Sequence, residues 1–160
     1  MKYTRWTIPR QIVEQTESAF LAGSHEVFAI WTASRGIREE SLQHAEIARA
    51  VVPAQTPGVS PGGVWVHIAG EELQRIQLEN FKLDERSIVQ LHTHPSEDVR
   101  MSQLDRKWEV VRHIGALSII VPCYGIHGLS LFEGANVYER EDDDWRLWSK
   151  DEAAERLVLR

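Results

Sequence analysis

The order in which short apolar runs and helical patterns follow one another most constrains the fold of this chain. Runs rich in β-branched and aromatic residues predict strands, and apolar residues at intervals of three and four predict helices. The predicted helices cover 9–22, 70–81 and 102–115, and an amphipathic helix closes the chain. The predicted strands cover 26–34, 42–53, 64–68, 87–92, 116–122, 128–134 and 136–141, and a short strand precedes the closing helix. Because these elements are interspersed without strict alternation, we expect a mixed α/β sheet rather than a doubly wound one.

One stretch interrupts the pattern of strands and helices. QTPGVSPGG (55–63) has proline or glycine at five of its nine positions, which predicts a loop. Trp65, close to this loop, could border a substrate groove, whereas the apolar setting of Trp31 favours packing in the core.

The length, net charge, cysteine count and hydropathy of the chain limit the classes of protein to which it can belong. With 160 residues the chain is expected to form a single domain, 1–160, with a core of its own. A net charge of −6 argues against binding nucleic acid, because contacts to phosphates need clustered Lys and Arg. Cys123 is the single cysteine and allows no internal disulfide. With neither a signal peptide nor about 18 unbroken apolar residues, we expect a cytoplasmic protein that does not enter a membrane.

The sequence LHTHPSEDVRMSQLD (91–105) indicates a metal site. Residues i and i+2 of a strand project from one face, so His92 and His94 can point at a single ion while Thr93 turns away. Imidazole nitrogens suit Zn²⁺, and Asp105, after a loop, can supply a carboxylate as the third ligand. Three protein ligands leave the fourth tetrahedral position for water, which is the layout of a catalytic zinc rather than a structural one.

Two further residues have both a structural and a functional interpretation. Ser102 and Asp105 match a helix-capping arrangement, which is the commoner role of a lone Ser-x-x-Asp. Capping and a role in the site can coexist. Glu26, at the start of a buried-looking strand, is the best candidate for a general base, although a carboxylate at a strand end is often simply exposed.

At these residues the chain resembles a known family. His-Thr-His-Pro (92–95), six residues and Ser-x-x-Asp (102–105) match the JAMM motif of the JAB/MPN zinc metalloproteases. That family also places a catalytic glutamate on an early strand after the first helix, where Glu26 stands. The resemblance runs roughly from Ile8 to the end of the chain, and the motif is its sharp part.

The resemblance implies a fold, an activity and a role for each residue. The fold would be cytidine-deaminase-like, a curved mixed β-sheet with packed helices. His92, His94 and Asp105 would hold Zn²⁺, Glu26 would activate water, and Ser102 would hydrogen-bond the oxyanion. The chain looks like the stand-alone bacterial type, without the two insertions by which eukaryotic deubiquitinases grip one ubiquitin linkage.

The resemblance also implies a partner. Active members cleave the isopeptide bond after the Gly-Gly tail of ubiquitin or a ubiquitin-like protein, so we expect such a protein or its conjugates as substrate. Stand-alone bacterial relatives occur with conjugation enzymes, including in antiphage defence operons. Three alternatives stay open: a non-catalytic MPN-type scaffold, a DNA-associated RadC-like member, and an enzyme that processes sulfur-carrier proteins. The intact motif argues against the non-catalytic scaffold, and the negative net charge argues against the DNA-associated member.

Overall fold

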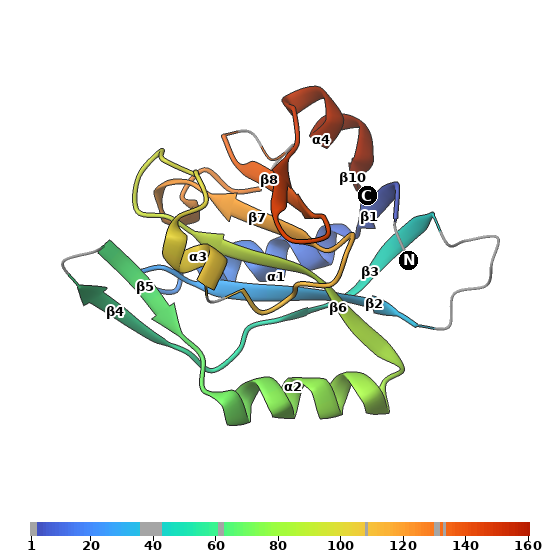
Figure 1. Ribbon diagram of the computed structural model, residues 1–160, viewed down its shortest axis with the longest axis horizontal. Helices are drawn as coiled ribbons and strands as arrows, with labels where there is room; N and C mark the ends of the chain where they lie inside the picture. The colour runs from blue at the N-terminus through green and yellow to red at the C-terminus, as the bar shows by residue number, and fades with distance from the viewer. Residues whose placement is uncertain (1–2, 36–42, 61–62, 108, 130–131, 133) are drawn as a thin grey trace.

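The computed structural model describes residues 3–160 except 36–42, 61–62, 108, 130–131 and 133. Within these residues eight strands form one curved sheet in the order β10-β1-β3-β2-β6-β7-β8-β9 (Figure 1). Its strands are β1 (Arg5–Ile8), β2 (Phe28–Ser34), β3 (His44–Val51), β6 (Glu85–Thr93), β7 (Leu117–Val121), β8 (Asn136–Arg140), β9 (Trp145–Leu147) and β10 (Leu157–Leu159). A separate hairpin pairs β4 (Thr56–Ser60) with β5 (Gly63–His67).

The main sheet mixes parallel and antiparallel pairs. β2 is antiparallel to both its neighbours, β3 and β6, whereas β6 and β7 are parallel. β1 is parallel to β3 and to β10. The predicted mixed α/β class with a curved sheet is therefore confirmed, and the more specific JAB/MPN fold stays a prediction.

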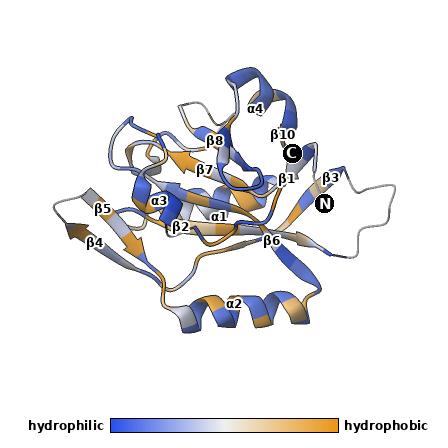
Figure 2. Ribbon diagram, viewed as in Figure 1, coloured by the Kyte–Doolittle hydropathy of each residue, from blue (hydrophilic) through white to orange (hydrophobic). Residues whose placement is uncertain are grey.

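Helices pack on the sheet through apolar stripes. α1 (Arg10–Phe20) buries Ile12, Val13, Thr16 and Phe20, which lie three and four residues apart on one face. α2 (Gly70–Lys82) buries Ile76 and Asn80 and alternates between hydrophobic and hydrophilic residues along its length (Figure 2). The short helices α3 (Gln103–Lys107) and α4 (Lys150–Arg156) follow later in the chain.

Two hydrophobic cores lie on the two sides of the sheet, and the central strands contribute to both. On β2 the fully buried Trp31 belongs to the core under α1, and its neighbour Ile30 belongs to the core that includes Ile76 of α2. Ile119 and Ile120 of β7 alternate in the same way. Strands buried on both faces are apolar throughout, which is why these runs were recognisable in the sequence.

The loop predicted at 55–63 is wrong over most of its length, because β4 occupies Thr56–Ser60 and pairs with β5. Proline and glycine weaken strands inside a sheet, but both strands of a two-stranded hairpin are edges, where Pro57 is tolerated. Gly58 lies opposite Trp65, and a Cβ atom at Gly58 would come within 2.1 Å of the indole. The glycine therefore leaves the space in which the Trp65 ring lies across the hairpin.

Two other predicted elements are shorter or absent. The helix predicted at 102–115 ends at Lys107, and the described residues from 109 to 115 are not helical. Buried Gln90 accepts hydrogen bonds from the backbone N–H groups of Val110 and Val111 at 2.9 Å, which ties this segment to β6 instead. No described residue of the strand predicted at 128–134 is in a strand, and 130, 131 and 133, like Trp108 of the predicted helix, lie outside the described residues.

Two short strands at one edge were not predicted. β1 follows the N-terminal residues, and β10 takes the last residues of the expected closing helix, which ends at Arg156. The two strands pair in parallel, with Trp6 opposite Leu157. Arg156 packs where these two strands meet. Its guanidinium lies over the rings of Trp6 and Trp148 and donates a hydrogen bond to the carbonyl of Tyr3. In the part of the chain that the structure describes, no helix is long and apolar enough to span a bilayer.

Candidate metal centre

His92 lies near the C-terminal end of β6, and His94 directly follows the strand. His92 pairs in register with Phe28 of β2 and with Ile120 of β7, so it extends from a strand held on both sides. The backbone N–H of His94 continues the pairing with β7 by donating to the carbonyl of Val121 at 2.8 Å. The Nε2 atoms of the two histidines lie 3.1 Å apart. The expectation that the two rings share one side of the strand is thus confirmed.

α3 brings Asp105 to the histidines. One oxygen of its carboxylate lies 3.2 Å from His92 Nε2, and the other lies 3.2 Å from His94 Nε2. Asp105 and Ser102 form a reciprocal capping box, in which the Ser102 N–H donates to the carboxylate at 2.8 Å and the Asp105 N–H donates to the Ser102 hydroxyl at 3.1 Å. The cap therefore fixes the carboxylate in the direction of the histidines.

The spacing of these three side chains fits a small metal ion. Ligands at about 2.0–2.1 Å from a tetrahedral Zn²⁺ lie about 3.3 Å apart. Here the two Nε2 atoms lie 3.1 Å apart, and each lies 3.2 Å from a different oxygen of the Asp105 carboxylate. Electron-donating atoms this close repel one another unless protons or a cation lie between them. Among the described residues, His92, His94 and Asp105 form the group of His, Cys, Asp and Glu side chains that could hold a metal ion.

The outer nitrogen of His94 has a defined partner. His94 Nδ1 lies 2.7 Å from the backbone carbonyl of Asp98 and donates its proton there, which leaves the Nε2 lone pair facing His92 and Asp105. His92 is held differently, because its ring stacks on Phe28 with the centroids 6.2 Å apart. Its buried Nδ1 has no hydrogen-bond partner among the described residues.

Electrostatics at the cluster favour an ionised carboxylate beside a readily protonated imidazole. Burial alone would raise the pKa of Asp105, but hydrogen bonds with His92 and His94 outweigh it and hold the pKa well below its usual range. Burial would lower the pKa of His94, but the hydrogen bonds to Asp105 and to the Asp98 carbonyl raise it instead. The carboxylate of Asp105 is thus held as an anion, and a cation bound at the cluster would take the place of the proton that His94 otherwise attracts.

Glu26 lies beside the cluster, two residues before β2 begins. Its side chain is buried, with 6% of its surface exposed, and burial raises its pKa to about 7 from an ordinary value near 4.5. His94 acts against this shift and Asp105 adds to it. The structure places this carboxylate beside the three predicted ligands, and a pKa near neutrality suits a group that exchanges protons.

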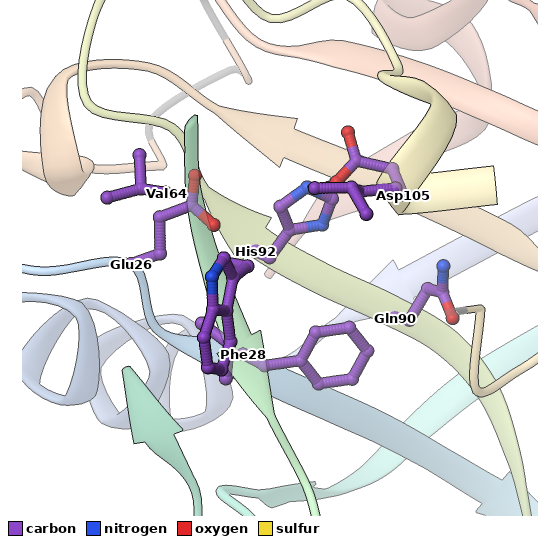
Figure 3. A pocket seen from close by; sticks show the side chains of 9 residues that line it. Glu26, Phe28, Val64, Gln90, His92 and Asp105 are labelled. Carbon is purple, nitrogen blue, oxygen red and sulfur yellow. The ribbon is translucent and has the colours of Figure 1, made fainter. Parts of the chain in front are cut away.

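A pocket opens at this cluster. Glu26, His92 and Asp105 line it, and Figure 3 shows them together with Phe28, Gln90 and Val64. Its remaining lining residues are Trp65, Val66 and Leu104, so the hairpin and α3 supply apolar walls. Trp65, which the sequence left undecided between packing and a groove, is 36% exposed and borders this pocket.

Gln55, which sequence analysis did not single out, holds the hairpin against the main sheet. Its side-chain amide accepts from the N–H of Phe28 at 2.7 Å and donates to the carbonyl of Phe28 at 2.9 Å. It also donates to the carbonyl of Pro53 at 2.8 Å. Gln55 therefore makes the two hydrogen bonds with the Phe28 backbone that a neighbouring strand would otherwise make. It lies just before β4 begins. A single glutamine in a loop has no sequence pattern that predicts such a role.

Comparisons with known proteins identify a curated relative and similar solved structures. No family model matches the chain. The chain is 35% identical over 98 residues to "Probable metalloprotease y4jG" of Sinorhizobium fredii (strain NBRC 101917 / NGR234), and the alignment covers 61% of this chain and 57% of that protein. The chain thus matches little more than half the length of this relative.

The fold has a counterpart among solved structures. The solution structure of protein DSY2949 from Desulfitobacterium hafniense superposes with a TM-score of 0.62 over 97% of this chain and 92% of that one. The two sequences are 12% identical, so this likeness concerns the fold alone.

Proposed function

We propose that this protein is a zinc-dependent peptidase of the JAB/MPN type that cleaves the amide bond after the tail of a ubiquitin-like protein. The observation that carries the proposal is the triangle of His92, His94 and Asp105, with atoms 3.1–3.2 Å apart, next to the buried Glu26. The name of the 35% identical relative, a probable metalloprotease, supports the class of reaction. The ubiquitin-like substrate rests on the resemblance of the JAMM motif.

The residues divide the chemistry between them. His92, His94 and Asp105 would hold the ion, and Zn²⁺ when bound would polarise the scissile carbonyl and lower the pKa of water toward about 7. Glu26, as the carboxylate, accepts a proton from the attacking water. As the C–N bond breaks and a C–O bond forms, Glu26 gives that proton to the departing amine.

Ser102 is placed to assist at the carbonyl oxygen. Its hydroxyl oxygen already accepts the N–H of Asp105 at 3.1 Å, which leaves the O–H proton to donate elsewhere. A hydrogen bond from this group to the carbonyl oxygen would strengthen as negative charge develops there. The capping role and the proposed catalytic role are thus compatible in one side chain.

The hairpin β4–β5 is the proposed contact for the extended substrate tail. Val64, Trp65 and Val66 of β5 line the pocket together with His92 and Asp105. A tail lying between the hairpin and β6 would pass the cluster with its backbone close to Glu26. Glycine next to the scissile bond would allow the backbone of such a tail to lie close to the Trp65 ring.

A cleavage assay with two substrates tests the proposal. Zinc-loaded protein is incubated with a ubiquitin-like protein ending in Gly-Gly and fused to a reporter, and with the same fusion carrying bulky residues in place of Gly-Gly. We expect cleavage after Gly-Gly only. Glu26→Gln should lower kcat by about 10³-fold or more while the zinc content stays near one per chain, because Glu26 is a proton carrier and not a ligand.

Two results of this assay would contradict the proposal. One is cleavage by Glu26→Gln at the wild-type rate, which would remove the base. The other is zinc binding without cleavage of conjugated, fused or sulfur-carrier-type Gly-Gly substrates, which would favour a scaffold. Glu46→Gln on the exposed side of β3 is the matched control and should behave like the wild type.

A further inference from the structure

β2 and β6 separate at the metal centre, and the separation falls between the proposed base and the ligands. The regular pairing of the two strands ends with Phe28 opposite His92. Beyond this pair, β6 continues beside β7 with Thr93 opposite Val121. The chain before β2 leaves toward Glu26. Some other contact must therefore hold Glu26 near the histidines.

The side chain of Thr93 makes that contact. In a regular antiparallel pair, Val27 and Thr93 would exchange two backbone hydrogen bonds. Here the N–H of Thr93 donates to the carbonyl of Val27 at 3.1 Å, but the N–H of Val27 donates to the Thr93 hydroxyl oxygen at 3.0 Å. The threonine side chain thus replaces its own carbonyl and bridges the two strands where they diverge.

The surroundings of this contact make it rigid. Thr93 is fully buried, and Val27 is 4% exposed. A β-branched side chain has few rotamers, and the N–H of Val27 is too deeply buried to take water as a partner when the hydroxyl is lost. Thr93 stands between the two histidines, and Val27 directly follows Glu26. A shift at this one contact would therefore move the carboxylate relative to the ligand pair.

We propose that Thr93 is the positioning residue that sets the distance between Glu26 and the His92, His94 and Asp105 cluster. It acts through the backbone of Val27 and need not touch the metal or the substrate. This inference rests on the proposed function, because it assumes that Glu26 is the base. It assigns a specific task to the residue between the two histidines, which is otherwise only a spacer.

Two substitutions at Thr93 separate the hydroxyl from the shape of the side chain. Thr93→Val keeps the shape and removes the acceptor, and we expect kcat to fall by about 10- to 100-fold, as for a misplaced catalytic group. KM should stay within about twofold and zinc content near one per chain, because the ligands and the pocket are unchanged. Thr93→Ser keeps the hydroxyl and should retain at least about half of the wild-type kcat.

A readout independent of activity follows the contact itself. Hydrogen–deuterium exchange at the Val27 amide should be slow in the wild type and in Thr93→Ser, and clearly faster in Thr93→Val. The metal-free and zinc-loaded proteins should show the same ranking, since the contact does not involve the metal. Thr93→Ser alone keeps the proposal testable if Thr93→Val does not fold. Loss of Val27 protection or of kcat in Thr93→Ser would overturn it.

A threonine in the core under α1 provides the control for general destabilisation. Thr16 is also fully buried, and its hydroxyl accepts from Trp31 Nε1 and donates to the carbonyl of Ile12, both at 2.8 Å. Thr16→Val and Thr93→Val should both lower the melting temperature, because each leaves a buried polar group without its partner, but Thr16→Val should leave kcat unchanged. A parallel fall of kcat in Thr16→Val and Thr93→Val would overturn the positioning role.

The outcomes also distinguish this inference from the proposed function. If wild type cleaves, Glu26→Gln does not, and Thr93→Val cleaves at the wild-type rate with an exposed Val27 amide, then the positioning role is wrong and the proposed function stands. If the zinc-loaded wild type cleaves no Gly-Gly substrate, the proposed function fails and the role of Thr93 fails with it.

Discussion

His92 and His94 extend from a strand that is paired on both sides, whereas Trp65 lies on a hairpin whose two strands pair only with each other. Around the histidines the backbone is buried, and Leu91 and Thr93 are fully inaccessible. On the hairpin, Val59 is 81% exposed and Trp65 is 36% exposed. Gln55 is the described side chain that fastens the base of the hairpin to Phe28.

This difference matches two different tasks. Metal ligands must stay within a few tenths of an ångström of their positions, so they belong on rigid elements. An element that closes over a flexible substrate tail must adjust, so it is held at few points. The account therefore predicts that changes at the cluster affect metal binding and kcat, and that changes on the hairpin affect KM.

The largest effect is expected for Asp105→Ala, which removes a ligand from the triangle. Zinc content should fall well below one per chain, and kcat/KM should fall on the order of 10³-fold, because the chemistry of the ion is lost. Metal analysis and cleavage of the Gly-Gly fusion measure the two quantities. Asp151→Ala, which removes an exposed carboxylate from α4, is the control. An Asp105→Ala protein with full zinc content would contradict the assignment of the ligands.

The next largest effect concerns Ser102, whose two roles can be separated. Ser102→Ala should cost about 1 kcal/mol of stability from the lost cap and lower kcat by about 10²-fold from the lost hydrogen bond to the oxyanion. Asparagine caps helices as well as serine does but has no hydroxyl. Ser102→Asn should therefore recover the thermal stability and not the activity. Recovery of both stability and activity in Ser102→Asn would show that Ser102 acts only as a helix cap.

A smaller and gradual change of kcat/KM is expected when the pH is varied. Glu26 must be ionised to act as a base, and burial raises its pKa from 4.5 to about 7, whereas a bound cation would favour the ionised form. The rate constant kcat/KM should therefore decline as the pH falls through a value between 4.5 and 7, by about tenfold per unit below it. Zinc content is measured at each pH, because protonation of the histidines also releases metal. A decline centred below 4.5 with zinc retained would contradict a buried base.

The smallest effect is expected on the hairpin. In Gly58→Ala the new Cβ would lie 2.1 Å from the indole of Trp65, so the ring must move from its place beside the pocket. KM should rise by about tenfold, equivalent to about 1.4 kcal/mol of binding, with kcat and zinc content unchanged. Gly70→Ala, where nothing lies within 4 Å of the added carbon, is the matched control. A fall in kcat without a change in KM would show that the hairpin belongs to the rigid part of the site.

The sequence could predict those features of the site that depend on local patterns. The positions of His92 and His94 follow from the two-residue period of a strand, and the link between Ser102 and Asp105 follows from helix capping. Both depend on residues close together in the chain. The motif predicts that these side chains meet in space. The structure brings His92, His94 and Asp105 together, and Ser102 is hydrogen-bonded to Asp105.

Long-range contacts account for what the sequence did not predict. The apolar spacing after Ser102 favours a long helix, but the amide of Gln90 captures the backbone at Val110 and Val111. Proline and glycine favour a loop at 55–63, but Gly58 makes room for a ring from the opposite strand. The hydroxyl of Thr93 takes the place of a backbone carbonyl. The partners of Gln90 and of Thr93 are distant in the sequence, whereas Trp65 lies seven residues from Gly58 on the opposite strand of the hairpin. None of these partners has a characteristic sequence pattern.

The most direct test of the metal centre is anomalous X-ray diffraction at the zinc absorption edge from crystals grown with zinc. The account predicts one peak at about 2.0–2.1 Å from Nε2 of His92, Nε2 of His94 and a carboxylate oxygen of Asp105, with Glu26 beside it and outside bonding distance. A zinc peak bound elsewhere, with these three side chains unliganded, would contradict it.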